Sequence, residues 1–203
     1  MPYTVKKGAL TFFIVALVVF ILFVGGCSVG CGYNNLVKLE EDVNSKWSQV
    51  ENQYQRRADL VPNLVETVKG YAAHEEETLT AVIEARAKAT QVNISVEDPS
   101  AQELEEYAAA QGELSQALGK LMAVAESYPD LKANENFLTL QAQLEGTENR
   151  IATERMRFNE SVQQYNRKRR SFPRNITAAI FGFDAKEYFQ ADKGAENAPK
   201  VAF

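Results

Sequence analysis

A sixteen-residue apolar stretch, Ala9–Val24, follows the basic residues Lys6 and Lys7 and constrains the fold more than any other feature of the chain. The stretch holds no charged residue, whereas a helix on the surface of a soluble protein keeps a polar face. We therefore expect it to attach the chain to a membrane. A spanning helix needs about 20 mostly apolar residues, and the uncharged residues 25–33 can supply the remainder. A span over residues 8–31 is one form of this attachment.

The second form is a lipid anchor. The run Val24-Gly25-Gly26-Cys27 resembles the bacterial lipobox, in which a cysteine is lipidated and becomes the mature N-terminus. A basic start followed by a moderate apolar region also fits a secretory signal. Cys27 is therefore a lipidation candidate, and the retained span and the lipoprotein both stay open.

The charges on either side of the apolar stretch predict its orientation. Two lysines precede it, and Glu40, Glu41 and Asp42 follow it. Basic residues flank the cytoplasmic side of a membrane segment. We therefore expect a bacterial membrane protein whose body lies in the periplasm or outside the cell.

The rest of the chain shows the apolar spacing of amphipathic helices. Large apolar residues recur at alternating steps of three and four from Asn34 onward, as they do on one face of a helix. We expect four helices, over residues 34–69 with a kink at Pro62, 72–91, 101–127 and 131–170. Leu79, Val82 and Ile83 should face inward in the second. Proline-containing breaks at Asp98-Pro99-Ser100 and Tyr128-Pro129-Asp130 separate the later helices.

These helices predict an all-α fold. Joined by short connections, they should form an elongated antiparallel four-helix bundle, preceded by an N-terminal transmembrane or lipoprotein-signal helix. The expected organisation is a membrane anchor over residues 1–33, the bundle over 34–172, and a C-terminal tail with a short amphipathic segment over 173–203.

The distribution of charge limits the class of partner. Residues 34–149 hold 9 basic and 21 acidic residues, a balance of −12, whereas residues 150–203 hold 11 and 6, a balance of +5. An acidic body argues against a general nucleic-acid binder. Both cysteines, Cys27 and Cys31, precede the body, so the body can hold neither a disulfide nor a cysteine-based metal site.

Four charged residues fall in the apolar phase of the predicted helices. They are Arg57, Arg86, Glu148 and Arg155. One interpretation places them at the edge of the apolar stripe with their charged ends in water. The other is a buried polar layer, which Asp59 could join and which would fix the register of the helices.

A cluster of basic residues ends the fourth predicted helix, and it allows two interpretations. It can be a solvated terminus whose cations offset the helix dipole. It can also be a membrane-facing surface, because the fourth helix should point back toward the bilayer and anionic headgroups attract basic residues. The cluster comprises Arg167, Lys168, Arg169, Arg170 and Arg174, and the apolar residues Phe172, Ile176, Ile180, Phe181 and Phe183 lie among and after them.

The sequence predicts neither an enzyme nor a cofactor or metal site. It contains a single histidine, His74, whereas a di-iron helical bundle needs paired Glu-x-x-His elements. It also lacks the glycine patterns of nucleophile elbows, phosphate loops and dinucleotide sites.

A set of short motifs runs through nearly all of residues 34–203. They are Trp47–Glu51, Gln55–Val65, Val68–Ala72, Glu84–Arg86, Tyr128–Asn134, Glu148–Ala152, Arg157–Asn159, Tyr165-Asn166, Phe172-Pro173 and Pro199–Phe203. Through these motifs the chain resembles the LemA family of bacterial membrane-anchored helical proteins. The resemblance implies a single N-terminal anchor, a long antiparallel bundle and no established enzymatic activity, and it also allows a cytoplasmic body.

We therefore expect a non-enzymatic scaffold or adaptor of the bacterial cell envelope that presents a helical bundle to partner proteins. The contacts expected for these unidentified envelope proteins are Arg56–Asn63 and Arg167–Arg174. The alternative is a membrane-organising protein that binds anionic lipid through the same basic end. Nucleic acid is not an expected partner.

Overall fold

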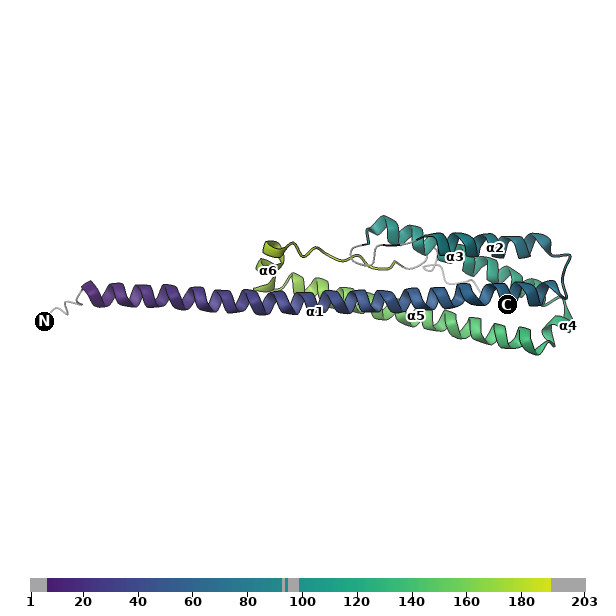
Figure 1. The fold of residues 1–203 in the computed structure, drawn as a ribbon, viewed down its shortest axis with the longest axis horizontal. Helices are drawn as coiled ribbons and strands as arrows, with labels where there is room; N and C mark the ends of the chain where they lie inside the picture. The colour runs from purple at the N-terminus through teal and green to yellow at the C-terminus, as the bar shows by residue number, and fades with distance from the viewer. Residues whose placement is uncertain (1–6, 93, 95–98, 191–203) are drawn as a thin grey trace, which may run out of the picture. The chain divides into compact units, whose positions relative to one another are not determined.

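The chain folds into helices. A computed structural model describes residues 7–92, 94 and 99–190, and Figure 1 shows their order. No strand occurs in this part of the chain, so the all-α class is confirmed for it. The helices are α1 (Lys7–Lys69), α2 (Glu76–Gln91), α3 (Ala101–Ala125), α4 (Pro129–Lys132), α5 (Glu135–Arg169) and α6 (Arg174–Phe181).

Helix α1 joins the apolar stretch and the first predicted body helix without a break. Pro62 lies inside α1 with its ring exposed, and the helix continues through it to Lys69. Among the described residues, none of the helices combines the length and the apolar character that crossing a bilayer requires. The side chain of the lipidation candidate Cys27 lies outside the described part of the chain.

Two expectations about the second helix were wrong. It begins at Glu76 rather than at residue 72, because the chain turns after α1, where the Ala72 N–H donates to the Val68 carbonyl at 2.8 Å. Ile83 is 53% exposed. The buried face runs through Leu79, Val82, Ala85 and Ala89, and Ile83 lies about 100° further around the helix from Val82.

The fourth predicted helix is interrupted near its start. Its first residues form the short helix α4, and α5 begins only at Glu135. Asn134 causes the break, because its side-chain oxygen accepts the Phe137 N–H at 3.0 Å. An asparagine that accepts from the amide three residues on is a preferred start of a new helix.

The structure divides into two compact units, each built from two segments of the chain. Among the described residues, the body unit comprises 42–92, 94, 99–162 and 186–190, and the end unit comprises 7–41 and 163–185. Helices α1 and α5 contribute residues to both units.

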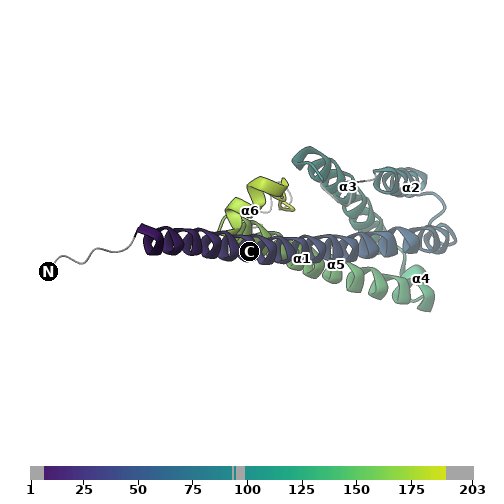
Figure 2. The same cartoon turned by 60° about the vertical axis from the view of Figure 1, so that its left-hand side comes forward.

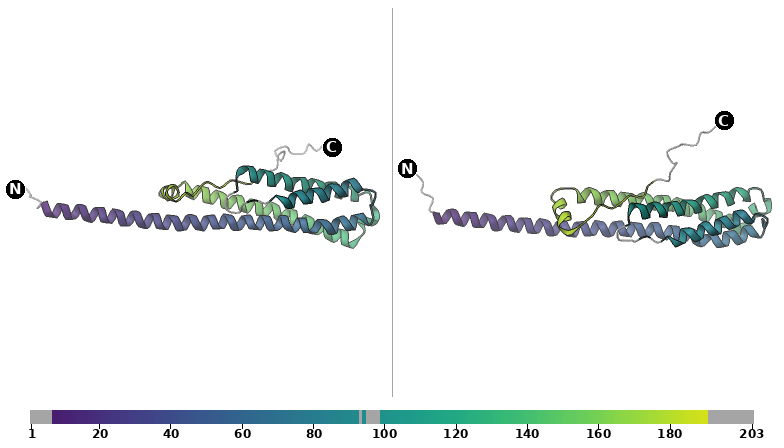
Figure 3. Two further views of the ribbon diagram at one scale, coloured as in Figure 1. Left: turned by 45° about the horizontal axis from the view of Figure 1, so that its top comes forward. Right: turned by 90° about the horizontal axis from the view of Figure 1, so that it is seen from above.

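One hydrophobic cluster forms most of the core of the body unit. It draws buried residues from α1, α2, α3, α4 and α5, with Leu64, Leu114, Leu121 and Leu131 fully buried. Helices α2 and α3 lie side by side in it (Figures 1 and 3). Burying one such side chain contributes about 1.5–3 kcal/mol, so apolar packing is the main source of stability here.

Aromatic rings extend this core along α1. The Trp47 ring lies 5.6 Å from Tyr107 of α3, 5.3 Å from Phe158 of α5 and 6.1 Å from Phe189, measured between centroids. The last contact packs Phe189 inside the body unit. Asn159 supports it, because its side chain donates to the Phe189 carbonyl and accepts the Phe189 N–H, both at 2.9 Å.

The end unit consists of part of α1, the end of α5, and α6. Figures 2 and 3 show α6 following α5 and lying against α1. Thr177 and Ala178 of α6 are buried in this unit, at 1% and 5% exposure.

Candidate functional site

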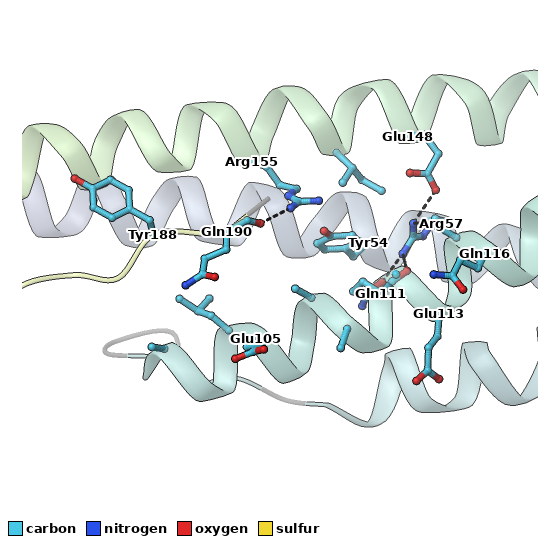
Figure 4. A pocket seen from close by; sticks show the side chains of 17 residues that line it. Tyr54, Arg57, Glu105, Gln111, Glu113, Gln116, Glu148, Arg155, Tyr188 and Gln190 are labelled. Carbon is cyan, nitrogen blue, oxygen red and sulfur yellow. Dashed lines mark hydrogen bonds and ion pairs between the residues drawn. The ribbon is translucent and has the colours of Figure 1, made fainter. Parts of the chain in front are cut away.

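A buried arginine joins three helices at the centre of the candidate site. Arg57 of α1 is 1% exposed. Its Nη1 donates to Glu148 Oε1 of α5 at 2.7 Å and to Ser115 Oγ of α3 at 2.5 Å. Its Nη2 donates to the side-chain and backbone oxygens of Gln111, at 2.6 and 3.0 Å. We call these four residues the Arg57 cluster (Figure 4).

The energetics of this cluster favour a role in helix register. Removing a charge from water is costly, and a buried ion pair repays that cost only with good geometry and further hydrogen bonds. Arg57 makes such bonds through both terminal nitrogens. Its Nε has no hydrogen-bond partner among the described residues. The Glu148 side chain is 44% exposed, so water shares its solvation. A shift of α1 would break all four of these bonds, a shift of α3 would break three, and a shift of α5 would break the ion pair with Glu148.

The structure brings together two of the five predicted polar-layer residues, Arg57 and Glu148. The other three lie elsewhere. Asp59, which could have joined a buried polar layer, is exposed and accepts a hydrogen bond from Gln55 at 2.7 Å. Arg86 donates to the Ala58 carbonyl at 2.8 Å. Arg155 donates to the Gln190 carbonyl at 2.8 Å and lies over the Phe189 ring at 4.1 Å.

Sequence reasoning missed the two partners on α3. Gln111 is buried in the apolar phase of α3, between Tyr107 and Leu114. A polar residue in an apolar phase is the pattern that identified Arg57, so the same pattern could have predicted Gln111. Ser115 lies beside that stripe, so its sequence position carries no such signal.

A cleft of about 460 Å³ opens beside the Arg57 cluster within the body unit. Its walls come from α1, α3, α5 and residues 188–190 (Figure 4). Half of the α3 residues in this wall are small, and Gly112 has nothing within 4 Å of the position that a Cβ would take. The other lining groups are mostly polar. They include Glu105, Glu113, Gln116, Arg155, Tyr188 and Gln190.

Burial alters the acid–base behaviour of two groups near this cleft. They line a second cavity of about 200 Å³. Burial raises the pKa of Glu51 above its ordinary value because the carboxylate loses hydration. Burial also raises the pKa of Tyr107, and the neighbouring Tyr54 and Glu51 add to that rise. Tyr107 therefore stays a neutral phenol at physiological pH.

The basic residues at the end of α5 form a second candidate surface, in the end unit. Arg167, Lys168 and Arg170 are exposed. Arg169 is half-buried, and its Nε donates to the Phe183 carbonyl at 2.6 Å. Arg174 is half-buried at the start of α6. We refer to these five residues as the basic end.

Two comparisons relate the chain to known proteins. The sequence profile of the LemA family matches residues 46–203. Magnetosome protein MamQ 2 of Paramagnetospirillum magneticum is 31% identical over 188 residues, which cover 83% of this chain and 68% of the relative. Magnetosome protein MamQ of Magnetospirillum gryphiswaldense is 30% identical over 186 residues, with the same coverage. Protein LemA of Metamycoplasma hominis is 25% identical over 160 residues, 79% of this chain and 69% of the relative. The chain therefore belongs to the LemA family.

Proposed function

We propose that this chain is a membrane-attached, non-enzymatic scaffold of the bacterial cell envelope that holds a partner protein in the cleft of its body unit. The observation that carries the proposal is the cleft itself, a preformed space beside a network that fixes three helices. A rigid site lowers the entropy cost of binding. In this proposal α1, α2, α3 and α5 form the elongated antiparallel bundle.

The chemistry of the cleft favours binding over catalysis. Ser115 is the hydroxyl that a hydrolase would use, but its oxygen accepts a hydrogen bond from Arg57. A guanidinium is only a donor and cannot take a proton from a serine. The described lining residues include neither histidine nor cysteine. The small residues of α3 leave room for an apolar side chain of a partner, and Glu105 and Glu113 favour basic groups beside it.

Two observations support membrane attachment. The N-terminal part of α1 exposes a run of apolar side chains, which include Phe12 at 72%, Val15 at 61% and Phe20 at 64%. Exposed apolar surface of this kind marks an interaction site. The MamQ relatives are magnetosome proteins by name. The charges around the apolar stretch support a body outside the cytoplasm.

Deleting residues 9–24 tests the attachment. The full chain should sediment with membranes and resist extraction by salt, whereas the deletion variant should stay in the soluble fraction. A deletion variant that still resists salt extraction would show that the apolar stretch is not the anchor. The intact mass of the membrane form then decides between a span and lipid on Cys27.

Filling the cleft tests partner binding. Gly112→Leu should occupy the cleft without a backbone clash, because its Cβ position is open and Gly112 is helical. A photoreactive side chain at Ala109, which also lines the cleft, should crosslink a specific envelope protein in cells. Gly112→Leu should abolish that crosslink. The matched control is Gly119→Leu, which is also open and on α3 but does not line the cleft. Equal crosslinking in both variants would contradict the proposal.

The exposed basic end favours a second candidate function, direct binding of anionic lipid. Three of its five cations are exposed, and residues 161–183 contain no acidic residue. Each basic residue near an anionic membrane contributes about 1 kcal/mol of attraction.

A further inference from the structure

Helix α6 is packed closely on α1 at one glycine. A Cβ added at Gly32 would lie 2.7 Å from the Oγ1 atom of Thr177. Only a hydrogen fits in that space, so the glycine is what allows α6 to approach α1. Next to it, the Tyr33 ring lies 4.8 Å from Phe181 and 5.6 Å from Phe183. Such aromatic pairs add about 0.5–1.5 kcal/mol each.

The chain after α6 is also fixed. Gly182 takes a left-handed conformation (φ 73°), and the Phe183 N–H donates to the Ala178 carbonyl at 3.0 Å. Two side chains of α5 then hold the following backbone. Tyr165 donates to the Asp184 carbonyl at 2.9 Å, and Arg169 donates to that of Phe183 at 2.6 Å. Helix α6 is therefore held by both α1 and α5 within the end unit.

Helix α6 and the residue before its N-cap expose large apolar side chains. Ile176 and Ile180 of α6 are 46% and 63% exposed, and Phe172, which precedes the helix, is 80% exposed. The two isoleucines are four residues apart, a spacing that places them on one face of the helix. Phe181 adds a ring that is 51% exposed. With the basic end beside it, the segment combines apolar and cationic groups as helices that lie in a membrane interface do.

The contact at Gly32 fixes how far along α1 this segment lies from either possible anchor. The proposed span ends at residue 31, one residue before Gly32 on the same continuous helix, a rise of about 1.5 Å. From Cys27 there are five residues, a rise of about 8 Å. The interfacial layer on each side of the hydrocarbon core is about 5–8 Å thick, and interfacial helices lie about 5–10 Å into the headgroup boundary. Both anchors therefore bring α6 near headgroup level.

We propose that Phe172 and α6 form a membrane foot, a segment that lies on the bilayer beside the anchor and binds its anionic headgroups. Phe172, Ile176 and Ile180 enter the interface, and Arg167, Lys168 and Arg170 contact the phosphates. The inference rests on the proposed membrane attachment and specifies what the basic end binds. Docked on α1, the foot gives the chain a second point of contact with the lipid.

Depth-dependent quenching in vesicles tests the foot. The full chain carries one fluorescent amino acid at residue 172 or 180, and Cys27 and Cys31 stay unchanged. It is reconstituted in vesicles of phosphatidylcholine and phosphatidylglycerol. Brominated acyl chains should quench both labels. The control label replaces Leu138, which is 50% exposed in the body unit, and it should keep its fluorescence.

Flotation of the same samples separates the two hypotheses. If the full chain does not float with the vesicles, the proposed attachment is wrong. If it floats but the labels at 172 and 180 are quenched no more than the label at 138, the foot is wrong and the attachment stands. A label quenched at 138 as strongly as at 180 would also overturn the foot, because the contact would not be specific to it.

Charge reversal tests the headgroup contact. The variant R167E/K168E/R170E leaves Arg169 intact because Arg169 holds the Phe183 carbonyl. Quenching at 180 should fall in vesicles that contain phosphatidylglycerol and should not fall in phosphatidylcholine alone. The matched control Lys88→Glu changes an exposed lysine of the body unit and should have no effect. Unchanged quenching in the triple variant, with circular dichroism showing intact helices, would refute the charge contact.

Discussion

At the scale of the residue, Arg57 is a charged group that is 1% exposed and hydrogen-bonded to two other helices. A buried guanidinium that loses its only charged partner keeps the cost of desolvation without the compensation. Glu148 is that partner in the described cluster, and the other acceptors are neutral. The free energy of unfolding should therefore depend strongly on Glu148, although its side chain is partly exposed.

Replacing Glu148 with alanine should lower the free energy of unfolding by about 1.5–3 kcal/mol, the range for hydrogen bonds to charged groups. Urea denaturation of the full chain in detergent would measure it. The control is Glu113→Ala, which breaks the exposed pair with Lys88 and should cost less than about 1 kcal/mol. Equal losses for the two variants would mean that burial of Arg57 adds nothing.

Glu51 should make stability depend on pH. Its pKa is higher in the folded state than the ordinary value of 4.5 because burial disfavours the carboxylate. At pH values below 4.5 Glu51 is protonated in both the folded and the unfolded state, so its burial does not lower the free energy of unfolding through ionisation. As pH rises, the unfolded chain releases the proton first, so stability falls.

Glu51→Gln should therefore be more stable than the natural chain at neutral pH, and the difference should vanish in acid. Urea titrations at several pH values would show this. Glu66→Gln changes an exposed carboxylate of the same helix and serves as the control. A difference for Glu51→Gln that persists in acid would point to packing rather than ionisation.

At the scale of the element, the apolar spacing was sufficient to predict most helices but not their ends. Helix α3 lies within the predicted range 101–127, and its buried face runs from Leu104 to Ala125. The break before α5 was missed because a single hydrogen bond, which the Asn134 side chain accepts from the Phe137 N–H, decides it. Periodicity averages over several turns and cannot detect one local cap.

The same limit applies to the candidate site. Arg57 and Glu148 could be identified because a charge in an apolar phase is visible in one helix at a time. The cleft could not, because its volume depends on side chains from α1, α3, α5 and residues 188–190 meeting in space. No pattern within one element contains that information.

The glycine of the α3 wall offers a prediction about this helix. Gly112→Ala should raise the free energy of unfolding by about 0.5–1 kcal/mol, because alanine loses less backbone entropy in a helix and its methyl group would meet open space. Gly182→Ala should instead lower it by about 1 kcal/mol, because Gly182 has a φ of 73°. Chemical denaturation compares them, and stabilisation by both would contradict this account.

At the scale of the whole molecule, the two proposed attachments would act on one chain and differ in physical origin. The apolar stretch would hold by the hydrophobic effect, which salt does not weaken. The membrane foot would hold partly by charge, which salt screens within about 10 Å at 0.1 M. The acidic region 34–149, at a balance of −12, would meanwhile be repelled by an anionic surface.

Raising the salt concentration should therefore separate the two attachments. Quenching of a label at residue 180 should decrease as salt increases, while the fraction of protein that floats with the vesicles should stay constant. Quenching that is insensitive to salt would assign the foot to apolar contacts alone. Flotation that falls in parallel would mean that charge also holds the anchor.

Because Gly32 has no side chain, a substitution at this position can detach the foot from α1 without changing any residue of the foot. Adding one methyl group in Gly32→Ala would push Thr177 away and undock α6, while every lipid-facing side chain keeps its identity. Faster hydrogen exchange in residues 174–181, with α2 and α3 unchanged, would report the detachment. One added methyl group would then leave the protein with one membrane contact in place of two. The contribution of docking the foot on α1 to membrane binding could thus be measured while the side chains of the foot stay unchanged.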